Sequence, residues 1–247
     1  RNFWIWEKYQ DDSKYLLVAD VARGDGADYS VFHVIKLATM EIVAEYQGKP
    51  TLDHYADILF DAGREYGSCL LVVENNGIGI SVLEKLINKE YPNLYYSIKG
   101  SHEYIEQHKA QYSSNSVPGF TNSSKTRPLI VAKMEEYIRN KLIIVRSSRL
   151  FHEFKTFIWH NGRPQAMRSY HDDLVMSLSI ACWVRDTAIE VDQRDVAYKK
   201  AMMGGMFLNS TKMNTTIKGQ DGYSQTFNEK YREEINQTKD FLWIYKG

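Results

Sequence analysis

The stretch YLLVADVA, residues 15–22, decides the fold, because it is a short apolar run that contains a single acid, Asp20. A turn rich in Gly and Asp follows at 23–28, and two further β-rich runs come next, at 30–37 and 41–48. Three such runs separated by turn signals are typical of an antiparallel meander. The opening of the sequence therefore predicts three antiparallel strands, with Asp20 near the end of the first.

The rest of the chain alternates helices with strands. From Leu52 the apolar residues recur at helical spacing, with Thr51 as the N-cap, and CLLVVE at 69–74 is a continuous apolar run, as in a strand buried on both faces. We expect further helices at 80–91, from beyond Pro128 to 138, from 148 to about 158 and at 172–188, short strands at 95–98 and near 165–169, and a loop or insertion at 99–124. This order predicts an α/β fold with a mixed sheet, in which the first three strands are antiparallel and later strands are parallel, flanked by helices.

Length and composition set the domain organisation. The 247 residues include no apolar run near the ~18 needed to span a bilayer, and the start lacks the layout of a signal peptide, so no membrane partner is expected. Cys69 and Cys182 lie in apolar stretches and are interpreted as buried thiols of a reducing compartment. Because the sequence opens with Arg1, we expect a fragment of a larger protein. The periodicity of apolar residues along the given sequence predicts one α/β domain at 1–189 and a partly irregular C-terminal extension at 190–247.

Charge is balanced overall but not along the chain. Lys plus Arg equals Asp plus Glu at 31 each, which excludes a global polycation. Residues 1–98 carry 9 basic and 15 acidic groups, a net of −6, whereas residues 99–163 carry 11 basic and 5 acidic groups, a net of +6. A metal-dependent enzyme that acts on a polyanion needs both kinds of segment. The alternative interpretation of this charge pattern is that solvent-exposed faces of the protein simply differ in the sign of their charge.

Four acids occupy positions that favour a common site. Asp20 and Glu74 each end an apolar strand, and Asp172 and Asp173 open the last predicted helix. Taken singly, Asp20 could cap a turn, Glu74 could pair with a lysine, and the two aspartates could be N-terminal helix acids. Ionised carboxylates are seldom placed in apolar strands unless paired or bound to a cation, so the joint pattern favours a cluster.

Clustered carboxylates repel one another, and a pair of divalent cations relieves that repulsion. Oxygen ligands favour Mg²⁺ or Mn²⁺, with substrate phosphate completing the coordination. Two such ions ~4 Å apart activate a water on one side of a phosphodiester and stabilise the leaving oxygen on the other. The sequence therefore predicts a metal-dependent enzyme that acts on a phosphate-bearing polyanion with two divalent ions.

Four strings carry a resemblance to a known family. They are VADVARGDGADYS at 18–30, VVENNGIG at 72–79, the SKTR…LIIV stretch at 124–145 and YHDDLVMSLSIA at 170–181. Together they resemble the nuclease domain of the large terminase subunit of tailed bacteriophages, of the headful-packaging myophage type, within the RNase H-like superfamily. The resemblance covers the core, whereas residues 190–247 match nothing in it.

The resemblance implies roles for particular acids. In the family, three acids are the catalytic metal ligands: the first acid of the opening strand, the acid after the fourth strand and the second Asp of the HDD string. Here these are Asp20, Glu74 and Asp173. Asp28 matches a further acid that helps to hold a metal or its water. Asp172 stays an alternative to Asp173 as the third ligand.

The resemblance also implies an activity and partners. It implies an endonuclease that cuts concatemeric double-stranded DNA when packaging begins and again when the head is full. The N-terminal ATPase motor of such a subunit is expected to be absent here, because no G-x-x-x-x-G-K-[ST] string occurs. Implied partners are that motor, the portal protein and the small terminase subunit. The implied location is the host cytoplasm, at the procapsid portal, and not the mature virion.

The net-positive segment supplies candidate DNA-binding residues. Lys125 and Arg127 lie in a string that resembles the family, while Lys133, Arg146 and Arg149 are weaker candidates. For Lys133 and Arg139, charges on a solvated helix face are the alternative. Contacts to the phosphate backbone carry affinity without base information, so little sequence specificity is expected.

Two other functional classes stay open. One is a different RNase H-like enzyme, such as a junction resolvase, a transposase or an RNA–DNA hybrid nuclease, which substrate preference would separate. The other is a non-catalytic module that binds DNA or a partner protein, in which case the acids would tolerate replacement by amides.

Overall fold

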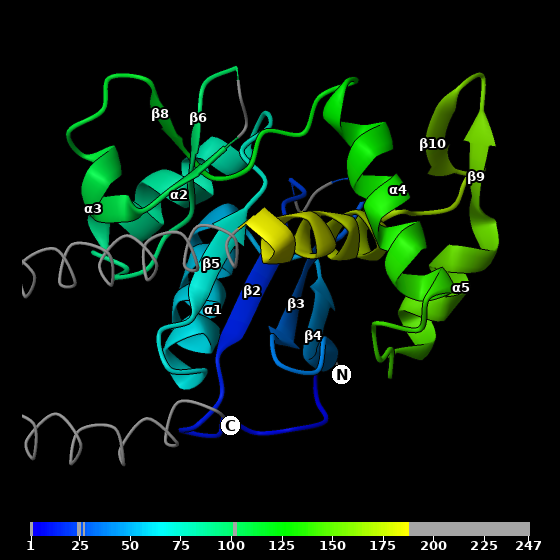
Figure 1. Cartoon of the computed structure of the whole chain (residues 1–247), viewed down its shortest axis with the longest axis horizontal. Coiled ribbons are helices and arrows are strands. Elements are labelled where there is room, and N and C mark those ends of the chain that lie inside the picture. Colours follow the sequence, from blue (N-terminus) through cyan, green and yellow to red (C-terminus); the bar gives the residue numbers. More distant parts are fainter. Residues whose placement is uncertain (1, 24–25, 27, 101–102, 188–247) are drawn as a thin grey trace, which may run out of the picture. The chain divides into compact units, whose positions relative to one another are not determined.

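The main sheet is mixed and has the strand order β1–β4–β3–β2–β5 (Figure 1). The structure is a computed structural model that describes residues 2–23, 26, 28–100 and 103–187. The strands are β1 (Phe3–Ile5), β2 (Tyr15–Asp20), β3 (Ser30–Lys36), β4 (Glu41–Gly48) and β5 (Leu70–Val73). As predicted, β2, β3 and β4 form an antiparallel meander, and β5 pairs with β2 in parallel. The short β1, which adds an antiparallel edge to β4, was not predicted.

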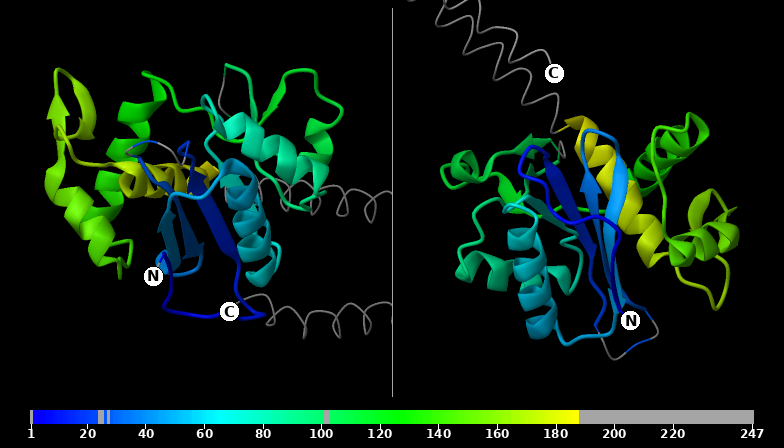
Figure 2. Two further views of the ribbon diagram at one scale, coloured as in Figure 1. Left: turned by 180° about the vertical axis from the view of Figure 1, so that it is seen from behind. Right: turned by 90° about the horizontal axis from the view of Figure 1, so that it is seen from below.

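Helices cover both faces of this sheet (Figure 2). One face packs against α1 (Leu52–Glu65) and α2 (Gly79–Asn88). The other packs against α4 (Thr126–Arg139), α5 (Ser148–Thr156) and a last helix described over residues 173–187. Both cores are made of aliphatic and aromatic side chains, so the predicted α/β architecture is confirmed.

Alternation along β2 decides which face Asp20 belongs to. Tyr15, Leu17 and Ala19 pack into the core beneath α1 and α2. Leu16 and Val18 pack into the opposite core, which includes the helix over 173–187. Side chains along a strand alternate between faces, so Asp20 continues the series of Leu16 and Val18. The carboxylate at the end of β2 therefore belongs to the face covered by the last helix.

The segment predicted as a loop at 99–124 is more ordered than expected. It contains β7 (Tyr104–Ile105), α3 (Gln107–Ala110) and β8 (Ser116–Pro118), and with β6 (Tyr96–Ile98) the strands form a small sheet in the order β7–β6–β8. The prediction was wrong because strands of two or three residues leave no period in a sequence, and pairing fixes them instead.

Two helix boundaries also differ from the prediction. The helix α4 begins at Thr126, two residues before Pro128, because proline is tolerated in a first helical turn, where amide groups lack intrahelical partners. The helix α5 ends at Thr156 and leads into a hairpin of β9 (Phe157–His160) and β10 (Arg163–Ala166), of which only a strand near 165–169 was expected.

Several remaining expectations can be placed. Cys69 and Cys182 are buried free thiols, as predicted. Across the residues that the structure describes, no helix combines the length and the apolar character that a membrane span requires. The predicted extension at 190–247 lies outside the described residues, so the division into a domain at 1–189 and an extension stays a prediction.

Candidate active site

The ends of β2 and β5 bring Asp20 and Glu74 side by side. The two strands are parallel, with Ala19 opposite Val73, and the backbone N–H of Glu74 donates to the carbonyl of Ala19 at 3.0 Å. Both acids are the residues that follow this last pair, so they leave the sheet at the same edge. Asp20 also accepts a hydrogen bond from the N–H of Val21 at 2.8 Å. Parallel pairing of β2 and β5 thus brings these two carboxylates together, as the pattern of acids in the sequence predicted.

Two glycines let the backbone crowd around Glu74. A Cβ atom at Gly79, the first residue of α2, would lie 1.9 Å from the carbonyl oxygen of Glu74. Gly119 has a φ of +78°, and a Cβ there would lie 2.4 Å from the carbonyl oxygen of Val73. Any larger residue at either position would push the chain away from the end of β5. The VVENNGIG string therefore fixes Glu74 through close backbone packing.

The helix over 173–187 brings Asp173 to the same edge. Asp173 is the first residue of this helix, and its Oδ2 accepts a hydrogen bond from the N–H of Tyr29 at 3.0 Å. Tyr29 directly precedes β3, the neighbour of β2, so this bond holds the helix start beside the end of β2. Asp20, Glu74 and Asp173, from three distant parts of the sequence, are thereby brought together.

The electrostatics of these acids show an excess of negative charge. Burial raises the pKa of Asp20 well above its ordinary value, and the nearby carboxylates of Glu74 and Asp173 raise it further. Burial also raises the pKa of Glu74, despite hydrogen bonds that favour its charged form. Burial, with the charges of Asp28 and Asp172, raises the pKa of Asp173 to about 6. The cluster is therefore short of positive charge, which is the condition that a bound cation relieves.

Amide side chains hold Glu74, and sequence reasoning missed them. Asn76 donates from Nδ2 to Oε1 of Glu74 at 2.9 Å, and Asn122 donates a second side-chain hydrogen bond to Glu74. The Oδ1 atom of Asn122 is buried and has no hydrogen-bond partner in the part of the chain that the structure describes. Such an orphaned oxygen on a side chain that contacts Glu74 is suited to a cation or its water. Asn122 had no sequence signal, because it lies in a polar stretch without periodicity.

Asp172 and Asp173 face different partners. Asp172 forms an ion pair with Arg127 and accepts the backbone N–H of Ala166 at 3.1 Å. Arg127 in turn donates from Nε to the carbonyl of Pro164 at 2.9 Å. Asp172 is thus tied to α4 and to the β9–β10 hairpin, whereas Asp173 faces the other carboxylates. This geometry favours Asp173 over Asp172 as a ligand, and the choice itself stays a prediction.

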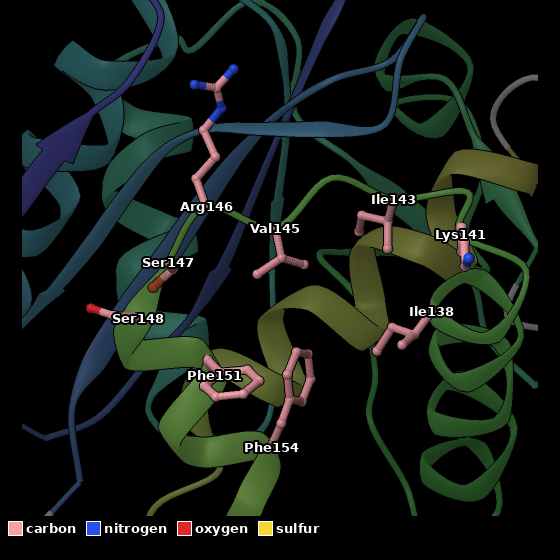
Figure 3. A pocket seen from close by; sticks show the side chains of 9 residues that line it. All are labelled: Ile138, Lys141, Ile143, Val145, Arg146, Ser147, Ser148, Phe151 and Phe154. Carbon is pink, nitrogen blue, oxygen red and sulfur yellow. The ribbon is translucent and has the colours of Figure 1, made fainter.

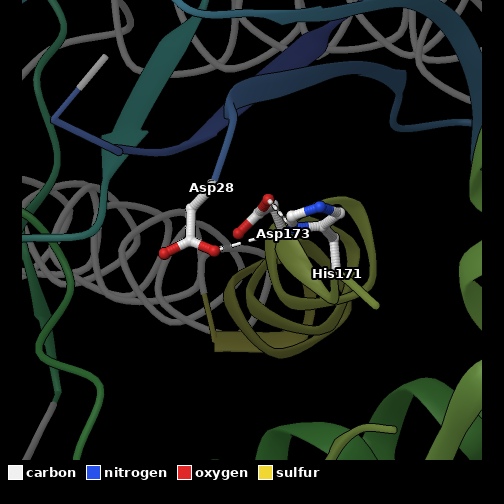
Figure 4. A group of neighbouring side chains, drawn as sticks. All are labelled: Asp28, His171 and Asp173. Atoms are coloured by element: carbon white, nitrogen blue, oxygen red, sulfur yellow. Dashed lines mark ion pairs between the residues drawn. The ribbon is translucent and has the colours of Figure 1, made fainter. Parts of the chain in front are cut away.

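A third group lies at the exposed side of the cluster. The Nδ1 atom of His171 is 3.6 Å from Oδ1 of Asp28 and 3.9 Å from Oδ2 of Asp173 (Figure 4). One ligand atom from each of these residues lies within 4.8 Å of the others. Asp28, which the sequence resemblance implies helps to hold a metal or its water, therefore lies beside Asp173, and that role stays a prediction. His171, which precedes the two aspartates, was given no role by the sequence.

Glu153 is a buried acid that sequence reasoning also missed. From α5 its Oε2 accepts the N–H groups of Leu174 at 2.9 Å and Val175 at 3.1 Å, and so caps the helix that carries Asp173. Burial raises the pKa of Glu153 to about 8, and the nearby Asp173 contributes. The signal was its spacing, because Glu153 follows Leu150 by one helical turn and shares its buried face.

Four of the candidate DNA-binding residues separate into two pairs. Lys125 is exposed directly before α4, and Arg127 lies beside the carboxylates in its ion pair with Asp172. Arg146 and Arg149 are instead paired with acids of β4, namely Glu41 and Glu45. The structure thus brings Arg127 to the cluster and commits Arg146 and Arg149 to ion pairs with the sheet. Their contact with DNA stays a prediction.

A pocket of about 510 Å³ lies apart from these acids, between the end of α4 and the start of α5 (Figure 3). Apolar side chains such as Ile143, Val145 and Phe154 line it, and Lys141 and Arg146 are its charged residues. Because it contains no carboxylate, it cannot be the predicted metal site.

Comparison with known proteins places the fold. No protein-family model matches the sequence. An RNase H-like α/β fold with a carboxylate cluster at one sheet edge is the class that the architecture defines. Among solved structures, the large terminase nuclease of thermophilic phage G20c with bound magnesium is similar, with a TM-score of 0.58 and 20% identity over 74% of this chain and 87% of that one. The same nuclease with bound cobalt gives the same values.

A second large terminase nuclease domain, from Thermus phage P74-26, is similar with a TM-score of 0.56 and 20% identity, over 73% of this chain and 84% of that one. The chain therefore has the fold of large terminase nuclease domains, which confirms the fold that the four sequence strings implied.

Proposed function

We propose that this chain is the metal-dependent nuclease domain of a phage large terminase, and that Asp20, Glu74 and Asp173 hold two divalent ions. The observation that carries the proposal is the convergence of these three acids at one sheet edge, with pKa values raised by burial and mutual repulsion. The fold supports it, as does the presence of magnesium or cobalt in the similar G20c nuclease.

The residues present fit divalent ions of the Mg²⁺ or Mn²⁺ kind. Carboxylate oxygens from Asp20, Glu74 and Asp173 are hard ligands, and the orphaned Oδ1 of Asn122 is a neutral oxygen on a side chain that contacts Glu74. Divalent cations supply Lewis-acid stabilisation of the charge that develops on a reacting phosphate. Asp28 lies at the exposed rim, where it supports the ion nearest Asp173.

The other side chains of the site position it and bind the substrate. Asn76 and Asn122 keep the carboxylate of Glu74 oriented, and Glu153 fixes the start of the helix that carries Asp173. Asp172 acts through its ion pair with Arg127 as a positioning residue. Lys125 supplies a positive charge for DNA phosphates at the mouth of the site. The substrate is double-stranded DNA. Little sequence preference is expected, because phosphate contacts carry no base information.

The biological setting follows from the same resemblance. The domain works beside the ATPase motor of its own subunit, with the portal protein and the small terminase subunit as partners. It cuts concatemeric DNA at the start and at the end of packaging, in the host cytoplasm at the procapsid portal, and is not part of the mature virion. Cutting by the full-length subunit during active translocation, compared with cutting by this chain, tests that setting.

Plasmid cleavage tests the activity directly. Cutting is expected with Mg²⁺ or Mn²⁺ and not with EDTA, and Asp20→Asn, Glu74→Gln and Asp173→Asn should each reduce it about a thousandfold. Asp172→Asn should keep part of the activity, because an amide oxygen still accepts the Ala166 N–H. Asp12→Asn, at an exposed turn, is the matched control.

Substrate preference separates the remaining alternatives. Linear duplex, four-way junction and RNA–DNA hybrid are compared under the same conditions, and the terminase reading requires that linear duplex be cut. A preference for junctions or hybrids would place the chain with other RNase H-like enzymes. Wild-type protein that cuts nothing, or variants that cut equally well, would favour a binding module.

A further inference from the structure

One ring nitrogen of His171, Nδ1, has no hydrogen-bond partner among the described residues. The side chain is partly exposed, but the Nδ1 atom is buried. A buried polar atom without a partner in a native structure is uncommon and points to an unseen water or ion. The ion-pair partners of this nitrogen are Asp28 and Asp173 (Figure 4), and Asp173 belongs to the carboxylate cluster.

We propose that Nδ1 of His171 is a ligand of a divalent ion shared with Asp28 and Asp173, and that it makes this position prefer Mn²⁺, Co²⁺ or Zn²⁺ over Mg²⁺. The inference rests on the proposed function, since it concerns the same metal site. It adds a ligand, and with it a difference in character between two ion positions, that the carboxylates alone do not supply.

The distances suit an ion between these atoms better than a direct contact. Gaps of 3.6 Å to Asp28 and 3.9 Å to Asp173 exceed the ~3.2 Å limit of a good N–H···O hydrogen bond. Two atoms that share an ion at about 2.1 Å each lie no more than about 4.2 Å apart. Both gaps are within that limit, and all three ligand atoms lie within 4.8 Å of one another. A small movement of the exposed Asp28 side chain completes the site.

Packing against an aromatic side chain orients the imidazole ring of His171. It packs edge-to-face against Tyr29, with the ring centroids 5.2 Å apart and an angle of 81° between the planes. The backbone N–H of Tyr29 binds Oδ2 of Asp173, so one residue positions both the ring and the carboxylate. Lys49 lies over the ring of Tyr29, with Nζ 4.6 Å from its centroid. Nδ1 is therefore free for coordination while the ring stays in place.

The chemistry of the donors divides the cluster into two positions. Asp20 and Glu74 offer only oxygen ligands, and so does the orphaned Oδ1 of Asn122, whose side chain bonds to Glu74; oxygen ligands suit Mg²⁺. Between Asp28 and Asp173 the donor set includes an imidazole nitrogen, which suits Mn²⁺, Co²⁺ and Zn²⁺ better than Mg²⁺. The HDD string thus supplies a nitrogen ligand, a positioning acid and a carboxylate ligand in three successive residues.

Metal binding to the whole chain, without DNA, tests the proposal. Mn²⁺ is added to the wild type, to His171→Ala and to His152→Ala, a control at an exposed histidine of α5, and nitrogen coupling is measured by pulsed electron paramagnetic resonance. The coupling should be present in the wild type and the control and absent in His171→Ala. Calorimetric titration should show Co²⁺ affinity reduced at least about tenfold in His171→Ala, and Mg²⁺ affinity reduced less than about threefold.

Two results would overturn the proposal. One is a wild type in which bound Mn²⁺ shows no nitrogen coupling. The other is a His171→Ala variant that loses Mg²⁺ and Co²⁺ affinity equally, with its thermal unfolding unchanged. His171→Asn, which keeps a polar side chain at the position, guards against a variant that fails to fold, and it too should lose the nitrogen coupling.

Its failure is distinguishable from failure of the proposed function. Nitrogen coupling in a chain that cuts no DNA would overturn the nuclease function and leave the mixed ligand set standing. Cleavage that needs Mg²⁺ or Mn²⁺, in a chain whose bound Mn²⁺ shows no nitrogen coupling, would overturn only the role of His171.

Discussion

Two groups of acids lie on the same sheet, and the chain balances their charges in opposite ways. On β4, Glu45 is fully buried between His33 and Arg149, with Nε2 and Nε at 3.1 and 2.8 Å from its two oxygens. Burial by itself would raise the pKa of Glu45, but the hydrogen bond and charge of His33, helped by Arg149, lower it. At the end of β2, Asp20 has carboxylates as its nearest charged neighbours, and its pKa is raised.

The difference separates a structural acid from a functional one. Glu45 has its counter-charges within the protein, so its role is complete in the folded chain alone. Asp20 and its neighbours carry a negative charge that the chain leaves largely unbalanced, and either protonation or a bound cation relieves it. Burial of an acid is therefore a poor indicator of a metal site, whereas burial without an internal counter-charge is a good one.

The largest effect on stability is expected from breaking the balanced group. Arg149→Ala would leave Glu45 buried with one partner, and would also remove the guanidinium that stacks over Trp4, 4.0 Å from its ring centroid. Removing one partner of a buried ion pair costs about 3–5 kcal/mol, so the free energy of unfolding should fall by that amount in urea titrations.

The control for this prediction is an ion pair on the surface. Arg139 contacts Glu135 at 3.0 Å along α4, and both side chains are more than half exposed. Arg139→Ala should lower the free energy of unfolding by no more than about 0.5 kcal/mol. Equal losses in the two variants would mean that burial of Glu45 contributes nothing to the difference.

The next effect is a dependence of stability on pH, with opposite signs for the two groups. The pKa of Asp173 is raised to about 6, so its favourable contribution is present below about pH 4 and is lost as the pH rises through 6. The pKa of Glu45 is lowered, so its contribution is present above its ordinary pKa and is lost in acid. The metal-free chain should thus be most stable at about pH 4, between the two transitions.

Thermal melts in EDTA and in Mg²⁺ check this dependence. Without metal, stability should fall between about pH 4 and pH 6.5 by at most about 3 kcal/mol from Asp173, given 1.36 kcal/mol per pKa unit. Mg²⁺ should restore much of the loss at pH 8 and have little effect at about pH 4, because ligands must be deprotonated to bind. Asp20→Asn should flatten the alkaline side of the profile. An alkaline side that is equally steep in that variant would assign the loss to other groups.

The sequence predicted the sheet edge well because its signals are local. The apolar runs at 15–22 and 69–74 each end in an acid, and parallel pairing of such strands places their ends together. The fold and the meeting of Asp20 with Glu74 follow from that. Gly79 lies in the VVENNGIG string at 72–79. That a glycine is required there becomes visible only in the structure, where the carbonyl of Glu74 leaves no room for a Cβ atom.

What the sequence could not predict depends on contacts between distant segments. A count of charges cannot say that Arg146 and Arg149 are paired with acids about a hundred positions earlier in the chain. Nor can it show that Asn122 meets Glu74, because the amide comes from a stretch with no period. The sequence also could not distinguish the roles of the adjacent residues Asp172 and Asp173. In the structure Asp172 faces Arg127, whereas Asp173 faces Tyr29.

The smallest effect concerns DNA affinity and compares the two ends of the sheet. Lys125 lies directly before α4, close to Arg127 and the carboxylates, whereas Arg146 is held by Glu41 at the opposite end. Glu41 is opposite Lys36, which is opposite Tyr15, five residues along β2 from Asp20. At about 3.3 Å per residue that is roughly 17 Å of strand.

Fluorescence anisotropy of a labelled duplex in Ca²⁺, over a series of salt concentrations, measures this effect. Lys125→Ala should weaken binding about tenfold at low salt and reduce the slope of affinity against salt by about one, because one phosphate contact is lost. Arg146→Ala should leave both quantities unchanged, since its guanidinium already neutralises Glu41. An equal loss in the two variants would instead extend the DNA path along the whole α4–α5 side of the sheet, and the internally balanced acids would then border the substrate as well.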